Sequence, residues 1–283
     1  MAGSKNPGCD AVSPPAQRPD SLSLMAWAVV AGVVFVAVCG PWLAPFDPLA
    51  TVPEQRLSSP SLAHPLGTDH LGRDLWSRVL TGAQISVGMA LAVVAVSALL
   101  GVIIGLISGA LGGRIDDVLM RLTDTFFAFP EMIAALAVAG MLGGGGWHLL
   151  LALGIVGWMR YARLVRGITV GMREREHVQL ARLNGIAWPR ILVHHLLPAT
   201  TPAVAVMMSA HVSRSILAIS GLGFLGFGVQ PPAPEWGTIL LEGRHYILAA
   251  PHYALLPGIP IIIAALAFNL AGDSLRDRLA VTP

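Results

Sequence analysis

The chain has 283 residues, of which 54% are hydrophobic and only 12% are charged, and its mean hydropathy is +0.68. Because an average soluble domain carries about 25% charged residues, this composition excludes an ordinary water-soluble enzyme. The formal net charge is +2, and the arginines that produce it are clustered rather than arranged as a nucleic-acid-binding stripe, so no nucleic-acid partner is expected.

Lys5 is the only lysine, so the chain lacks the Gly-Lys-Ser/Thr end of a phosphate-binding loop. We therefore expect that it hydrolyses no ATP itself, is not an enzyme and needs no cofactor. Cys9 and Cys39 have neither the spacing of a disulfide framework nor that of a metal site.

Residues 1–23 form a tail rich in proline and serine that cannot bury enough apolar surface to fold, so we predict that it is disordered. An uncharged apolar segment at about 24–44 follows. Its apolar part begins after the tail and is longer than the core of a typical signal peptide. We therefore interpret it as an uncleaved membrane anchor rather than a cleaved signal.

Further uncharged runs are long enough for the roughly 20 residues that a helix needs to cross the hydrocarbon core. A run of four glycines, Gly143 to Gly146, divides one of them and predicts a tight turn between two helices. The sequence thus predicts an all-α integral membrane protein in which residues 24–283 form the transmembrane domain. Its six transmembrane helices are expected at about 24–44, 86–109, 126–142, 147–166, 199–220 and 253–271.

The placement of arginine predicts the orientation, because loops that stay in the cytoplasm are enriched in Lys and Arg. The loop at 160–198 holds the densest group, namely Arg160, Arg163, Arg166, Arg173, Arg175, Arg182 and Arg190. If this loop is inside, both termini are inside as well. We therefore predict a multi-pass protein of the inner membrane with cytoplasmic N- and C-termini.

The same loop has the pattern of a short helix, a glycine stop and a second helix. The helical stretch continues to Asn184, and Gly185 stands where a C-terminal glycine can take a positive φ at little cost. Pro189 can begin the next helix. An exposed helix of this kind fits a groove on a soluble partner. The alternative is an interfacial helix whose arginines contact lipid headgroups.

The spacing of this loop resembles the EAA loop of ATP-binding-cassette importer permeases. Gln179-Leu180-Ala181 is followed by Gly185 and, twelve positions later, by Leu197-Pro198. In that family the loop docks into the ATPase subunit. The resemblance therefore implies a coupling role for Glu176, Gln179, Ala181, Gly185, Leu197 and Pro198. The match is partial, because Gln179 stands at the usual glutamate position and Leu180 replaces an alanine.

Three other segments, at 66–78, 220–237 and 267–277, resemble the permeases for dipeptides, oligopeptides and nickel. The resemblance covers the chain from about Leu24 to its end and implies the second permease type of that family. The implied partners are a second homologous permease, two ATP-binding-cassette ATPases, an extracytoplasmic substrate-binding protein and the lipid bilayer. Short peptides, or nickel or a nickel chelate, are the implied cargo.

Arg214 lies inside a predicted transmembrane helix, where a charge is costly and usually faces a cavity or a partner. Its position suggests the outer end of the helix, whereas Glu131 is expected near the inner end of the third helix, so depth argues against a pair between them. Two interpretations stay open: Arg214 lines the translocation pathway, or it forms a structural pair with a neighbouring subunit.

The outer segments hold polar residues for which structural roles are expected. Thr68 or Asp69 is predicted to cap the following helix, with substrate contact by Asp69, Arg73 and Asp74 as the alternative. The outer histidines are scattered, and no metal site is predicted from them; they are His64, His70, His148, His245 and His252.

Two other classes of function remain as alternatives. A secondary transporter would need internal repeats and ionisable residues near the membrane midplane. An intramembrane serine protease would need Ser220 within hydrogen-bond reach of His211 or His252.

Overall fold

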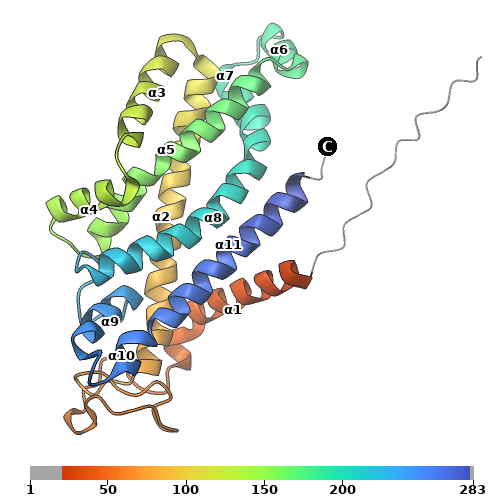
Figure 1. The fold of residues 1–283 in the computed structure, drawn as a ribbon. Helices are drawn as coiled ribbons and strands as arrows, with labels where there is room; N and C mark the ends of the chain where they lie inside the picture. Colours follow the sequence, from red (N-terminus) through yellow and green to blue (C-terminus); the bar gives the residue numbers. More distant parts are fainter. Residues whose placement is uncertain (1–20, 281–283) are drawn as a thin grey trace, which may run out of the picture.

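The computed structural model describes residues 21–280, which form a bundle of helices (Figure 1). Of the predicted tail at 1–23, residues 1–20 lie outside the described range. Ser21 to Ser23 already belong to the first helix. At one end of the bundle lie α6 and α7, and at the other lie α9, α10 and the long connection that follows α1.

The elements follow one another in this order: α1 (Ser21–Leu43), η1 (Pro53–Gln55), α2 (Leu75–Leu111), α3 (Gly113–Phe127), α4 (Glu131–Leu142), α5 (Gly146–Arg173), α6 (Glu176–Leu183), α7 (Trp188–Ile191), the π-helical turn η2 (Leu192–Leu196), α8 (Leu197–Phe224), α9 (Trp236–Gly243), η3 (Arg244–Tyr246), α10 (Pro251–Leu255) and α11 (Gly258–Ala280).

Five helical segments between residues 21 and 280 are long and apolar enough to cross a membrane, and the bent pair α3 and α4 makes up to six. The structure differs from the expected spans mainly in length. α2 has 37 residues, about 55 Å of helix, and extends well beyond a hydrocarbon core of about 30 Å. The expected turn at the four glycines is present, because α4 ends at Leu142, Gly143 caps it in a left-handed conformation, and α5 begins at Gly146.

The expected single helix at 126–142 is wrong. The chain bends by 88° between α3 and α4, and only the twelve residues of α4 match the expected span. Pro130 causes the break, because it has no backbone N–H to donate and it disfavours a helical conformation at Phe129. α3 is instead held against α5 by ion pairs that join Asp116 to Arg166 and Asp124 to Arg163.

The most extensive helix contact in the described bundle joins α2 to α5. Gly101, Gly105 and Gly109 recur at four-residue spacing on the α2 face that contacts α5. A Cβ atom at Gly105 would lie 2.6 Å from the carbonyl oxygen of Ala162, so a larger residue could not fit without moving the backbone. The absence of side chains at this ladder lets the two helix backbones approach each other directly.

α1 and α11 lie side by side and cover one flank of the bundle (Figure 1). Ser274 on α11 is hydrogen-bonded to Ser23 on α1, with 2.5 Å between the two Oγ atoms, and it accepts a hydrogen bond of 3.3 Å from Trp27 Nε1. On its other side α11 packs against α8, where Ser213 Oγ donates to the carbonyl oxygen of Ala265 at 2.7 Å.

Candidate functional site

The predicted coupling residues lie in the segment that joins α5 to α8. Its helix α6 ends in a Schellman motif, in which Gly185 N donates to the carbonyl oxygen of Arg182 at 2.9 Å and Ile186 N donates to that of Ala181 at 3.1 Å. Gly185 has φ = +77°, as the expected glycine stop requires. Pro189 stands in the first turn of α7, which agrees with its predicted position.

One face of α6 is anchored and the other is open. Val178 and Ala181 are buried in a cluster that also contains Ile191 and Leu196. On the opposite face Leu183 is 83% exposed and Leu180 is 57% exposed. Such large apolar side chains on a polar helix offer a contact surface to another molecule.

The other predicted coupling residues surround this helix. Glu176 opens α6 and Gln179 lies exposed on it, with Gln179 Nε2 donating to the carbonyl oxygen of Glu174 at 3.1 Å. Leu197 and Pro198 begin α8, next to buried Leu196. The carbonyl oxygen of Leu197 accepts hydrogen bonds from the hydroxyl groups of Thr200 and Thr201. The segment therefore connects the exposed helix α6 to α8 through α7 and η2.

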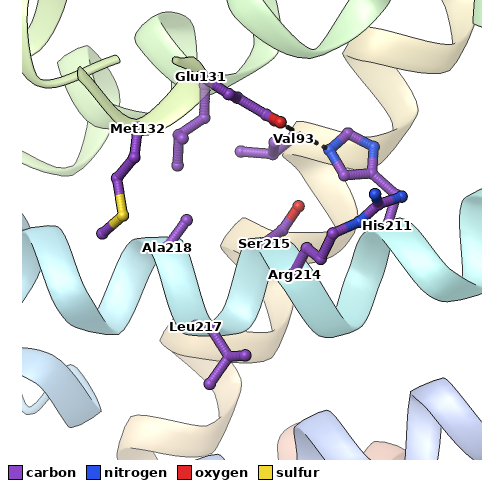
Figure 2. Close-up of a pocket in the computed structure, with 9 residues that line it drawn as sticks. Val93, Glu131, Met132, His211, Arg214, Ser215, Leu217 and Ala218 are labelled. Atoms are coloured by element: carbon purple, nitrogen blue, oxygen red, sulfur yellow. Dashed lines mark ion pairs between the residues drawn. The ribbon is translucent and has the colours of Figure 1, made fainter. Parts of the chain in front are cut away.

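α8 also carries Arg214, which lines a pocket with a cavity volume of about 260 Å³ between α4 and α8 (Figure 2). Within residues 21–280 the Arg214 side chain has neither a hydrogen bond nor an ion pair. The pocket is lined by Val93, Glu131, Met132, Leu153, His211, Arg214, Ser215, Leu217 and Ala218.

Glu131 lies in the same pocket as Arg214, so depth does not separate the two residues, although they form no ion pair in the described part of the chain. The bend at Pro130 moves the start of α4 toward the middle of α8 instead of leaving it at the end of a straight transmembrane helix. Glu131 Oε2 accepts a hydrogen bond from Arg160 Nη2 at 2.7 Å. Glu131 Oε1 lies 4.0 Å from His211 Nε2, the contact drawn in Figure 2.

His211 continues this polar network into the bundle. Its Nδ1 atom lies 3.0 Å from the hydroxyl oxygen of Tyr161, and both side chains are buried. The network thus joins α4, α5 and α8 around one wall of the pocket. Sequence reasoning missed it, although Glu131 directly after Pro130 was a local sign that the acidic residue begins a helix.

The N-terminal end of α2 and the loop before it hold a second polar network. Buried Asp69 pairs with Arg73 and Arg78, and both arginines also pair with Glu242, at 3.1 Å from Arg73 and 2.8 Å from Arg78. Burial alone would raise the pKa of Asp69, but Arg78, Arg73 and backbone N–H groups bring it below the ordinary value of 3.8. The predicted cap by Thr68 or Asp69 is wrong, because Asp74 caps α2 by accepting from Ser77 N at 2.8 Å.

Asp69, His70 and Glu242 also bring three potential metal-ligand atoms within 4.8 Å of one another. Both carboxylates already pair with arginines, and His70 Nδ1 lies 2.9 Å from the hydroxyl oxygen of Tyr253. Burial lowers the pKa of His70 and favours its neutral form. The arrangement is therefore a neutralised structural network rather than an open cation site.

The geometry required for a serine protease is not met. The buried hydroxyl group of Ser220 has no hydrogen-bond partner in the described part of the chain, so neither His211 nor His252 activates it.

Residues 101–280 match the family described as "Binding-protein-dependent transport system inner membrane component". Over 255 residues the chain is 38% identical to the nickel transport system permease protein NikC of Escherichia coli (strain K12), covering 90% of this chain and 92% of that protein. It is 38% identical over 258 residues to the probable D,D-dipeptide transport system permease protein DdpC of the same strain, with coverages of 91% and 87%.

The glutathione transport system permease protein GsiD of Escherichia coli O157:H7 is 39% identical over 263 residues, with coverages of 93% and 87%. These relatives are transport permeases rather than enzymes, and their likeness does not fit a secondary transporter. Family membership, together with the apolar helices, indicates a multi-pass location in the inner membrane and implies an ATPase and a binding protein as partners. The chain belongs to the family of inner-membrane components of binding-protein-dependent transport systems, and it is a permease component of an ATP-binding-cassette importer.

Proposed function

We propose that this chain and a second homologous permease together form a pathway that carries short peptides, or nickel or a nickel chelate, into the cytoplasm. Two ATPase subunits supply the energy, and an extracytoplasmic binding protein delivers the cargo. The main structural support is α6, which is anchored on one face and exposes Leu180 and Leu183 on the other. We assign this surface, with Glu176, Gln179, Leu197 and Pro198, to ATPase docking. Buried Ala181 anchors α6, and Gly185 ends it, so we assign both to holding the docking helix in place.

The direct test is uptake by the purified complex in proteoliposomes. We expect uptake of dialanine or of Ni²⁺ that requires both ATP and the binding protein. If neither probe is transported under these conditions, the cargo assignment is wrong. If transport occurs without any ATPase bound to the permease, the coupling assignment is wrong.

The orientation is tested by cysteine labelling in intact cells, with native Cys9 and Cys39 replaced by serine. Ser59, before α2, and Asp277, near the end of α11, are both exposed, whereas Ser274 is buried between α1 and α11 and is unsuitable. We expect an impermeant maleimide to label Ser59→Cys in intact cells and Asp277→Cys only after permeabilisation. The opposite pattern would reverse the orientation.

The pathway role of Arg214 is tested by Arg214→Gln. Glutamine keeps a polar side chain of similar reach, so the complex should assemble in normal yield. Loss of charged hydrogen bonds to cargo, about 1.5–3 kcal/mol, should reduce uptake of an anionic cargo about tenfold or more per assembled complex. Arg121→Gln, on an exposed position of α3, is the matched control. A reduced yield with unchanged uptake per complex would instead assign Arg214 to a structural pair with a neighbouring subunit.

A further inference from the structure

A second pocket, with a cavity volume of about 500 Å³, lies between α5, α8 and α11. Arg214 lines this pocket as well as the one beside Glu131, so hollow space lies on both sides of its side chain. The second pocket follows one stripe of α8, because Ala203, Met207, Ala210 and Arg214 recur at helical spacing.

Arg276, from the last turns of α11, lines the same pocket. α11 runs antiparallel to α8, and a Cβ atom at Gly272 would lie 2.6 Å from Ser209 Oγ. Gly272 lies beside Ser209 and Arg276 is one turn further along α11, so the backbone of Arg276 lies roughly 13 Å along α8 from that of Arg214. The two arginines thus mark two different depths of one pocket.

Within residues 21–280 neither arginine has a buried partner in direct contact, although Glu131 acts on Arg214 electrostatically from the neighbouring pocket. Arg214 has no ion pair there, and Arg276 Nη1 lies 3.9 Å from Asp273 Oδ1, with both side chains more than half exposed. Such a pair is screened by solvent and contributes little. The described lining residues include no acidic side chain, so the pocket combines an apolar wall with two positive charges.

The position of Arg214 argues that the pocket faces water or protein rather than lipid. An unpaired guanidinium within a membrane-spanning helix is unfavourable against hydrocarbon and is found at cavities and partners. The pocket therefore continues the hollow region beside Glu131 toward the end of the bundle where α11 terminates.

We propose that this pocket is the inner chamber of the pathway and that it receives cargo carrying a carboxylate, bound first at Arg214 and then at Arg276. This inference rests on the proposed function. A guanidinium holds a carboxylate through two parallel hydrogen bonds. A second arginine further along lets the cargo leave the first, because conduction needs several sites of moderate strength rather than one strong site.

The test measures the charge preference of the chamber without cargo or ATP. The assembled complex, with Cys9 and Cys39 replaced by serine and with Ala210→Cys, is treated in inside-out vesicles with two thiol reagents. One is the anionic methanethiosulfonate ethylsulfonate, and the other is the cationic methanethiosulfonate ethyltrimethylammonium. We expect the anionic reagent to react about tenfold faster, because a positive cleft concentrates anions.

Substitutions of the two arginines test whether Arg214 and Arg276 cause the preference for the anionic reagent. Arg214→Gln and Arg276→Gln should each reduce it severalfold, and Arg276→Lys should retain it. Arg278→Gln, at the same end of α11 but outside the pocket lining, is the matched control and should leave it unchanged. The proposal is overturned if Ala210→Cys reacts with neither reagent, or if the preference survives both glutamine variants.

Lipid composition separates cargo binding from the competing occupant, an anionic lipid headgroup. If the preference appears only in vesicles of phosphatidylcholine and disappears with phosphatidylglycerol, lipid phosphate fills the site and the proposal fails. Labelling and uptake are read separately. Normal uptake without a preference for the anionic reagent rejects the chamber proposal but not the proposed transport function. A preference for the anionic reagent without any uptake rejects the proposed transport function but not the chamber proposal.

Discussion

Gly185→Val is expected to abolish uptake while leaving the permease in the membrane. At φ = +77° the backbone of residue 185 is left-handed, a conformation that a β-branched residue adopts only at a cost of about 1–3 kcal/mol. No atom lies within 4 Å of the place where a Cβ would stand, so the effect comes from backbone strain and not from a clash. The strain breaks the Schellman hydrogen bonds and releases the end of α6.

Two measurements check this result: the amount of ATPase that co-purifies with the permease, and the uptake per permease in proteoliposomes. Both should fall severely for Gly185→Val. Gly185→Asn is the matched control, because asparagine tolerates the left-handed region, and it should retain most of the uptake. Normal transport by the valine variant would reject the role of Gly185 in coupling.

Asp69→Ala is expected to lower the stability of the purified permease by about 3–5 kcal/mol, the usual cost of removing one partner from a buried ion pair. The change leaves buried Arg73 and Arg78 with only Glu242 between them. Two nitrogen atoms of Arg78, Nε and Nη2, already lack hydrogen bonds in the described structure. Apart from Glu242, no group there compensates Arg78 for the loss of Asp69. Thermal unfolding in detergent, followed by the loss of monodisperse protein, measures the effect.

Asp47→Ala provides the control, because Asp47 is exposed and its carboxylate accepts only a local hydrogen bond from Leu49 N. It should change stability by no more than about 0.5 kcal/mol. Equal melting temperatures of Asp69→Ala and Asp47→Ala would show that the Asp69 network contributes little to the stability of the permease.

The pH dependence of this network follows from the lowered pKa of Asp69. A carboxyl group whose folded pKa lies below its unfolded value of 3.8 contributes its full stability above that value and loses it as the pH falls through the folded pKa. The difference in melting temperature between the wild type and Asp69→Ala should therefore stay constant from pH 8 to pH 5. It should shrink only below pH 3.8. A difference that vanishes near neutral pH would contradict the assignment.

Local features of this chain could be predicted from sequence, and distant contacts could not. The apolar runs, the glycine turn at 143–146 and the stop at Gly185 each depend on neighbouring residues. The break at Pro130 was also a local signal, but the uncharged run around it concealed a change of direction. The approach of Glu131 to His211 depends on that bend. The pairing of Arg73 with Glu242 joins residues 169 positions apart and requires the folded arrangement of α2 and α9.

The glycine ladder between α2 and α5 has a mechanical consequence. Along Gly101, Gly105 and Gly109 the α2 side of this contact carries no side chains, and the α5 backbone and Cβ atoms pack directly on the α2 backbone, so we expect the two helices to move as one rigid unit. If the pathway opens first to one side of the membrane and then to the other, we expect α2 and α5 to be carried together. We expect the hinge at the bend between α3 and α4, where Pro130 interrupts the helical hydrogen bonds and Glu131 begins the helix that lines the pocket.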